Sequence, residues 1–357
     1  MKGTVDQNMN GSVVVMKGQT GEVIAMASNP SFDPNNFAAG ISSEKWNALV
    51  DDEWHPLQNR SIHGQYPPGS TYKIVTALAG LEEGVIKPDT SIYCPGHFKL
   101  GRGRYRCWKK SGHGSMNLHN ALVQSCDVYF YTIGHRLGID TIAKYAKRFG
   151  LGSSTRLGLS QEKSGLVPTI KWKQLNKKEP WLLGETISAS IGQGFNLVTP
   201  MQQVSMIAAV ANGGMLLKPY LVKRIEEPEG QIREEFFPNI VGHLGADPEH
   251  LEQIRRALRD VVNGNRGTAR KSRLKNIIVS GKTGTAQVVR MKSNEELEKG
   301  EAIPVKYRDH AWFVAFAPYE KPEIAVAIII EHGGHGGATA APIAKKIFKK
   351  YFKLYPP

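Results

Sequence analysis

Two segments far apart in the chain carry residues that could perform acyl transfer. Residues 65–73 read QYPPGSTYK, with Ser70 three positions before Lys73, and residues 280–285 read SGKTGT. Positions i and i+3 share a face of a helix, so Lys73 is predicted to lie beside the Ser70 hydroxyl. Partial removal from water lowers the pKa of a lysine, which can then take the serine proton. Together the segments predict a serine acyltransferase without a catalytic histidine.

The Ser-x-x-Lys spacing alone is weak evidence. The same spacing recurs at Ser42 and Lys45, at Ser160 and Lys163, and at Ser272 and Lys275. A serine in such a position often only caps a helix. Ser70 differs because the prolines and glycine of 67–69 force an extended approach and a tight turn. The apolar residues 74–81 then predict a buried helix.

A third segment, residues 125–127, reads Ser-Cys-Asp and follows a short predicted helix that Asn117 would cap. A break after this helix would point the side chains into a cleft. There Ser125 can relay a proton between Lys73 and a leaving amine. Asp127 can accept hydrogen bonds from a substrate amide or from a lysine.

The surrounding pattern predicts an α/β fold in which both ends of the chain share one sheet covered by helices. A β-hairpin is expected over 12–27, and a short helix near 43–50. A helix-rich stretch follows over 118–214, then a strand pair within 218–245 and an amphipathic helix over 248–263. The remaining elements are strands at 277–289, 311–317 and 323–331, and a basic helix at 341–352. The charged stretch 291–308 is predicted to be a long loop.

Composition indicates a folded enzyme with anionic partners. The 357 residues suffice for one large or two modest domains, and the formal net charge is +14. Because the basic residues are scattered and no nucleic-acid-binding motif accompanies them, we do not expect nucleic acid as a partner. No apolar run is long enough to span a membrane and no signal peptide is recognisable, so we expect a soluble piece of a longer protein.

The order YPPGSTYK, SCD, SGKTGT resembles the transpeptidase domain of penicillin-binding proteins, within the wider family that includes serine β-lactamases. The resemblance covers essentially the whole chain, including segments 59–60, 191–194, 199–202 and 267–269. It is similar to class B, elongation-type proteins, the branch called penicillin-binding protein 2. It implies an antiparallel five-stranded sheet flanked by helices, with an all-helical subdomain. Residues 1–357 would form the transpeptidase domain, and a membrane anchor and pedestal domain would lie outside this chain.

The resemblance also implies roles for the first two motifs. Ser70 would be the nucleophile and Lys73 its general base. Ser125 would relay the proton, and Asp127 would position the substrate and the lysines.

The SGKTGT segment would bind the substrate. Lys282 and Thr283 would hold its carboxylate, and Gly284 would let the strand approach closely. The backbone N–H groups of Ser70 and Thr285 would form the oxyanion hole, which makes Lys282 and Thr285 part of the catalytic set.

The reaction implied by the family is peptidoglycan D,D-transpeptidation. A D-alanyl-D-alanine stem peptide acylates the serine, D-alanine leaves, and the acyl group passes to an amine of a neighbouring stem. β-Lactams would trap the same serine, and no organic cofactor is needed. The expected partner is a membrane glycosyltransferase of the rod-shape machinery, bound through the missing N-terminal part. The expected location is the periplasmic face of the inner membrane.

The cysteines suggest a metal. Cys94, Cys107 and Cys126 are the only three, and His113 lies among them. Three thiolates and an imidazole form the closed tetrahedral set typical of structural zinc. Elongation-type relatives are expected to use a metal near this loop, with carboxylates at some of the positions where this chain has cysteines. Thiolates bind zinc better than carboxylates do. A disulfide with one free thiol, or three buried thiols, are the alternatives.

Two other kinds of protein are compatible with these motifs. A serine β-lactamase shares the three motifs, but it needs a group for rapid deacylation, and Glu179 only faintly fits that role. A β-lactam sensor or a noncatalytic scaffold for wall synthesis is a further possibility. The histidine- and glycine-rich residues 332–337 are interpreted as a flexible turn before the last helix, not as a metal site.

Overall fold

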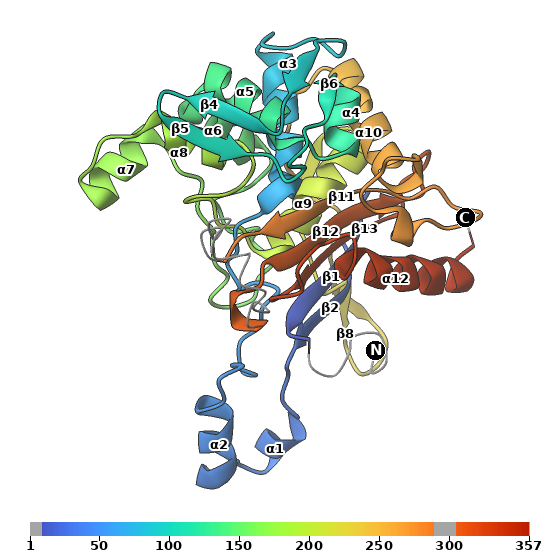
Figure 1. Ribbon diagram of the computed structural model, residues 1–357. Coiled ribbons are helices and arrows are strands. Elements are labelled where there is room, and N and C mark those ends of the chain that lie inside the picture. The colour runs from blue at the N-terminus through green and yellow to red at the C-terminus, as the bar shows by residue number, and fades with distance from the viewer. Residues whose placement is uncertain (1–8, 289–304, 357) are drawn as a thin grey trace.

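A five-stranded antiparallel sheet lies at the centre of the computed structural model, which describes residues 9–288 and 305–356. Its strand order is β11-β12-β13-β1-β2. The strands are β1 (Gly11–Lys17), β2 (Val23–Asn29), β11 (Ser280–Ala286), β12 (His310–Ala317) and β13 (Ile324–Ile330). Both ends of the chain therefore contribute to one sheet, as the sequence predicted (Figure 1).

The middle strands are apolar because both faces of the sheet are covered. Every residue of β13, whose sequence is IAVAIII, is buried. Successive side chains point to opposite faces, so Ile329 packs in one hydrophobic cluster and Ile328 in the other. Residues of α9 (Pro200–Ala211) belong to the first cluster, and residues of α12 (Ala340–Leu354) belong to the second.

The helices were mostly placed correctly by the sequence. α2 (Ser43–Val50) and α10 (Pro248–Asn263) have the predicted bounds, and α12 extends slightly beyond them. The helix-rich stretch contains α4 (Leu118–Val123), α5 (Asp127–Leu137), α6 (Ile139–Arg148), α7 (Ile170–Lys177), α8 (Leu183–Ala189) and α9. With the buried α3 (Lys73–Glu82), helices α4 to α8 form a helical part on one side of the sheet (Figure 1). No helix among the described residues is long and apolar enough to cross a membrane.

Several small strand pairs escape the sequence pattern. β3 (Ile92–Cys94) pairs with β6 (Gly114–Met116), and β4 (His97–Leu100) pairs with β5 (Gly103–Arg106). The predicted strand pair within 218–245 is present as β8 (Arg224–Glu226) and β9 (Ile232–Glu235). A further pair joins β7 (Met215–Leu217) to β10 (Ile240–His243). Of the predicted loop 291–308, residues 291–304 lie outside the described residues, and 305–307 form a short 3-10 helix.

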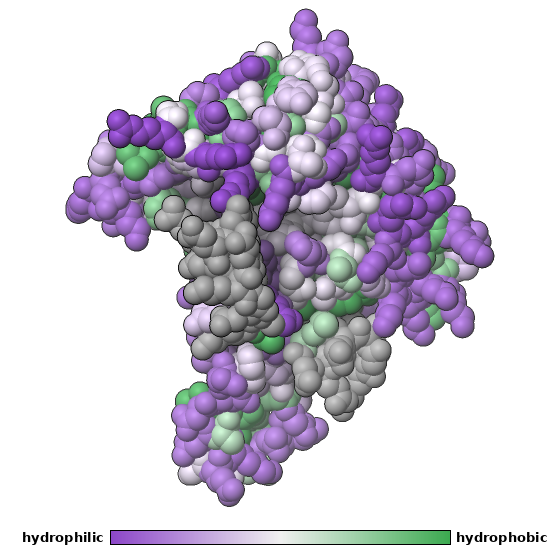
Figure 2. All heavy atoms as spheres, viewed as in Figure 1, coloured by the Kyte–Doolittle hydropathy of each residue, from purple (hydrophilic) through white to green (hydrophobic). Residues whose placement is uncertain are grey.

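A lobe that carries α1 (Asn35–Ala38) and α2 extends from the sheet between β2 and the Ser70 segment (Figure 1). Neither helix buries a residue, and Figure 2 shows hydrophobic side chains exposed among hydrophilic ones. The Ser42 hydroxyl accepts the Lys45 N–H at 3.3 Å. This copy of the Ser-x-x-Lys spacing is therefore a helix cap.

Candidate active site

The Ser70 segment is a 3-10 turn, Gly69–Tyr72, that leads directly into α3. Gly69 has φ +54° and donates its N–H to the Gly192 carbonyl at 2.9 Å. A Cβ on Gly69 would lie 2.5 Å from the Thr285 carbonyl oxygen, so only glycine lets the turn approach β11 this closely. The turn thus holds the half-buried Ser70 against the strand that carries SGKTGT.

Lys73 is fully buried and is the first residue of α3. Its ammonium donates to Asp127 Oδ1 at 2.6 Å, to the Ser125 carbonyl at 2.9 Å and to Ser125 Oγ at 3.2 Å. The Phe130 ring lies 5.6 Å from the same nitrogen. Lys73 is therefore oriented by the Ser-Cys-Asp segment, which the chain supplies more than 50 residues later.

Ser125 lies at the expected break between helices, after α4 and before α5. Its φ of +56° is unusual for a residue other than glycine, and such strain concentrates at functional sites. Ser125 Oγ receives hydrogen bonds from Lys73 and, at 3.0 Å, from Lys282. One hydroxyl thus bridges two lysines, an arrangement suited to moving a proton. Asn117 caps α4, as predicted, by accepting the Asn120 N–H at 3.0 Å.

Asp127 uses both carboxylate oxygens inside the protein. Oδ1 accepts from Lys73, and Oδ2 accepts the Trp108 N–H at 2.9 Å. Burial raises the pKa of Asp127, and the Lys73 cation opposes this shift. The Trp108 indole also donates to the Ser125 carbonyl at 3.0 Å. The sequence did not indicate a role for Trp108, except through its position next to Cys107.

The SGKTGT segment forms β11 and brings Lys282 within hydrogen-bond distance of Ser125. Lys282 is fully buried, and its ammonium also donates to the Thr283 carbonyl at 3.2 Å. Burial lowers the pKa of Lys282 well below its usual value, and the Lys73 cation adds to this effect. A Cβ on Gly284 would lie 2.9 Å from the Pro68 carbonyl, so glycine is needed there too.

Two further side chains fix the strand. The hydroxyls of Thr268 and Thr283 are 2.8 Å apart, and Gln193 Nε2 donates to the Thr285 carbonyl at 3.1 Å. Thr268 and Gln193 come from segments 267–269 and 191–194, which the family resemblance had included without a stated role.

These residues border a cavity of about 1270 Å³. The predicted site residues on its wall are Ser70, Ser125, Asp127, Thr283 and Thr285. Four cations also line it, namely Arg104, Arg106, Arg270 and Lys271. Arg104 and Arg106 lie on β5, in a strand pair that the sequence did not predict. Glu179, the carboxylate considered for a β-lactamase, instead lies 3.4 Å from Lys173.

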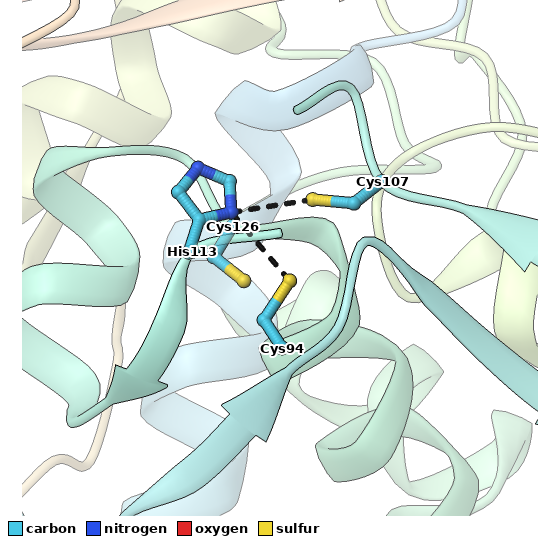
Figure 3. A group of neighbouring side chains, drawn as sticks. All are labelled: Cys94, Cys107, His113 and Cys126. Carbon is cyan, nitrogen blue, oxygen red and sulfur yellow. Dashed lines mark hydrogen bonds between the residues drawn. The ribbon is translucent and has the colours of Figure 1, made fainter. Parts of the chain in front are cut away.

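The structure brings the three cysteines and His113 together (Figure 3). Their four potential ligand atoms all lie within 4.8 Å of one another. His113 Nδ1 faces the sulfurs of Cys107 and Cys94 at 3.4 Å and 3.6 Å. All three cysteines are buried free thiols. Because Cys126 stands between Ser125 and Asp127, this group adjoins the active-site segment directly.

The electrostatics of the group favour a thiolate at Cys107. Interaction with the Cys126 thiol lowers the pKa of Cys107, and His113 adds to the effect. The same interaction, together with burial, raises the pKa of Cys126. A buried thiolate among two thiols and an imidazole is a donor set that suits a soft divalent cation.

Known peptidoglycan D,D-transpeptidases resemble this chain over most of its length. At 39% identity, 96% of the chain matches the peptidoglycan D,D-transpeptidase MrdA of Haemophilus influenzae and covers 53% of that protein. MrdA of Escherichia coli K12 is also 39% identical, over 92% of the chain and 52% of its own length. The chain therefore spans about half the length of the curated relatives it matches.

Solved structures show the same relationship. Pseudomonas aeruginosa PBP2 in complex with WCK 5153 has a TM-score of 0.83 and 36% identity, covering 97% of this chain and 74% of that one. Helicobacter pylori PBP2 in complex with MreC has a TM-score of 0.86 and 33% identity, covering 98% and 61%. These matches confirm the predicted fold. Residues 11–349 match the penicillin binding protein transpeptidase domain, and the chain belongs to this family.

Proposed function

We propose that the chain is the catalytic part of a peptidoglycan D,D-transpeptidase that acts through an acyl-enzyme at Ser70. One observation carries the proposal: Ser70, Ser125 and Asp127 line one cavity, Lys73 and Lys282 both donate hydrogen bonds to Ser125, and Lys73 also donates to Asp127. The names of the curated relatives support this activity, although the chain matches only half their length.

The first half-reaction forms the ester. Ser70 Oγ attacks the carbonyl carbon of the penultimate D-alanine, and Lys73 takes up the hydroxyl proton while one of its own ammonium protons moves to Ser125. Ser125 passes a proton to the nitrogen of the terminal D-alanine as its C–N bond breaks, so D-alanine leaves as the amine. The backbone N–H groups of Ser70 and Thr285 would stabilise the oxyanion, each by about 3–4 kcal/mol.

The second half-reaction reverses these proton movements. The amine of a neighbouring stem peptide attacks the ester carbonyl, the new amide bond forms, and the bond to Ser70 Oγ breaks. The proton released by the amine returns to Ser70 Oγ through Ser125 and Lys73. Lys282 and Thr283 would hold the substrate carboxylate during acylation.

The test is a donor stem peptide ending in D-alanyl-D-alanine, incubated with the purified chain and a second stem that offers an amine. We expect one D-alanine released for each cross-linked product, and no product from a Ser70→Ala variant. A chromogenic β-lactam should form a long-lived adduct. Rapid turnover of that β-lactam would favour the β-lactamase alternative, and cross-linking by the Ser70→Ala variant would contradict the proposed nucleophile.

A structural zinc ion fits the cysteine group and is part of the proposal. Cys94, Cys107, His113 and Cys126 supply four soft donors from one buried cluster, which is the closed set of a structural site. Bound zinc would fix the fold of the loop rather than take part in acyl transfer. Protein purified without chelator should contain about one zinc per chain. Metal-free protein with full acylation activity and unchanged stability would contradict this.

The remaining expectations concern the whole protein. We propose that residues 1–357 are its transpeptidase domain, that a membrane anchor and pedestal precede them, and that the domain works in the periplasm at the inner membrane. Its role would be in lateral wall elongation and cell shape, beside a membrane glycosyltransferase. The Helicobacter pylori relative is described in complex with MreC, and a further relative is described within a peptidoglycan synthase complex that coordinates polymerization and crosslinking. Co-purification of the full-length protein with its glycosyltransferase, absent when the preceding part is deleted, tests the partner.

A further inference from the structure

Asp309 stands at the edge of the active-site cavity, where two sheet strands meet. β11 ends at Ala286, which pairs with His310 at the start of β12. Asp309 and Gln287 therefore follow at the same end of this strand pair, and both line the cavity that contains Ser70. The Asp309 carbonyl accepts the Gly334 N–H at 2.8 Å, which holds its backbone in place.

Among the described residues, the Asp309 carboxylate has no lysine or arginine partner. No lysine or arginine in the described ranges, 9–288 and 305–356, lies within salt-bridge distance of it. It is about half buried, which raises its pKa, while the Val288 N–H and His335 stabilise the charged form. His335 also lines the cavity, but no ion pair joins it to Asp309 in the described part of the chain.

The charges around the cavity make this carboxylate distinctive. The other carboxylate on the wall, Asp127, is fully engaged by Lys73 and the Trp108 N–H. The exposed cations on the wall would repel a positively charged ligand. Asp309 is thus the position on the described wall where a ligand cation would be favoured.

We propose that Asp309 is a subsite for a primary ammonium group of the stem peptide. This inference rests on the proposed function, because transpeptidation requires a stem that carries an amine. The amine has two possible sources with the same chemistry: the side chain of the donor stem, extended along β11 beyond Thr285, or the incoming acceptor. Asp309 would hold this group as an ammonium ion, and an acceptor amine would leave the carboxylate and lose a proton before it attacks the ester.

Two measurements distinguish the sources. In the first, the chain is acylated by two thioester donors, Nα-acetyl-lysyl-D-alanyl and Nα-acetyl-norleucyl-D-alanyl thioglycolate, which differ only in the amine. In the second, the norleucyl donor is used throughout, and the ratio of amide product to hydrolysis product is measured with Nα-acetyl-lysine amide as acceptor. Amide formation there replaces the Ser70 ester bond and returns the amine proton to Ser70 Oγ.

The variants are Asp309→Asn, Asp309→Glu and, as a matched control, Asp51→Asn on the distant lobe. If the donor amine binds Asp309, the lysyl donor should be preferred in the wild type, and Asp309→Asn should reduce this preference roughly fivefold. If the acceptor amine binds, the amide-to-hydrolysis ratio should fall by a similar factor instead. Asp309→Glu should retain most of either effect, and Asp51→Asn should change neither.

Ratios within one variant are insensitive to a general loss of folded protein. Wild-type and Asp309→Asn chains with the same donor preference and the same product ratio would overturn the inference. In contrast, a wild-type chain that neither donor nor a β-lactam acylates would contradict the proposed function itself.

Discussion

Two buried polar clusters meet at the Ser-Cys-Asp segment, and they are satisfied in different ways. The lysine cluster consists of Lys73, Ser125, Asp127 and Lys282. The thiol cluster consists of Cys94, Cys107, His113 and Cys126. In the lysine cluster, ammonium groups, a carboxylate and a hydroxyl hydrogen-bond one another at 2.6–3.2 Å. The thiol cluster has only weak sulfur donors and acceptors, for which a cation is the better partner.

This difference indicates separate roles for neighbouring residues. Under the proposed function, the lysine cluster would move protons at Ser70, and its buried charges make it costly to maintain. With zinc bound as proposed, the thiol cluster would hold the loop that presents Ser125 and Asp127. If so, changes in the first cluster should act mainly on acylation, and changes in the second mainly on stability and metal content.

The largest effect is expected from Lys73→Met. Loss of a general base should slow acylation by a fluorescent penicillin about 10²–10⁴-fold. The variant also leaves the buried Asp127 without its cation, which should lower the free energy of unfolding by about 3 kcal/mol. Quenched time-course assays measure the acylation rate, and urea denaturation measures the free energy of unfolding. Lys171→Met, on the exposed face of α7, is the matched control. Near-normal acylation of Lys73→Met would contradict the assignment of Lys73 as the general base.

Cys107→Ser should separate the two clusters. We expect the zinc content to fall from about one per chain to near zero. With free zinc a thousandfold above its Kd, the lost stabilisation would be about 4 kcal/mol. A chelator should destabilise the wild type and the His135→Gln control but leave Cys107→Ser unchanged. Equal zinc content in the variant and the wild type would show that Cys107 is not a ligand.

Lys282→Met should have opposite effects on activity and stability. Lys282 is buried with a lowered pKa, so between that pKa and about 10.5 the unfolded state binds more protons and stability rises with pH. At pH 7 the wild type therefore bears a cost that methionine avoids. We expect the variant to be more stable by about 1 kcal/mol or more, while losing acylation.

The pH dependence checks this reasoning. Denaturation of both proteins from pH 7 to pH 10 should show the stability advantage of Lys282→Met shrinking as the pH rises. A stability advantage that stays constant or grows over this range would mean that folding does not lower the pKa of Lys282.

The smallest effect is expected from Trp108→Phe, at the junction of the two clusters. The backbone N–H to Asp127 remains, but the indole hydrogen bond to the Ser125 carbonyl is lost. One such bond contributes about 1 kcal/mol, so acylation should slow roughly fivefold with zinc content unchanged. Loss of zinc in this variant would show that a change beside the lysine cluster also disrupts the thiol cluster, so the two do not act separately.

The sequence predicted those elements whose signals are local. α10 begins after a capping Asp247 with Pro248 at its first position, and its apolar residues repeat with helical spacing. β12 and β13 are short apolar runs bounded by turns. The break after the helix that Asn117 caps was also expected, and it lies between Val123 and Asp127.

Features that depend on distant contacts were not predictable. The orientation of Lys73 comes from Ser125 and Asp127, and no spacing within its own helix indicates it. The pairing of β4 with β5, which brings Arg104 to the cavity, involves strands too short and too polar for a clear alternation. The contact of Trp108 with the active-site segment joins two loops that only the fold brings together.

Peptide mapping by mass spectrometry after treatment with benzylpenicillin tests the central claim most directly. The intact wild-type chain should gain the mass of one penicillin, and the modified peptide should contain Ser70. A Ser70→Ala variant, folded and with the same zinc content, should gain nothing. No adduct on the wild type, or an adduct on another residue that persists in Ser70→Ala, would contradict the proposed serine acyltransferase.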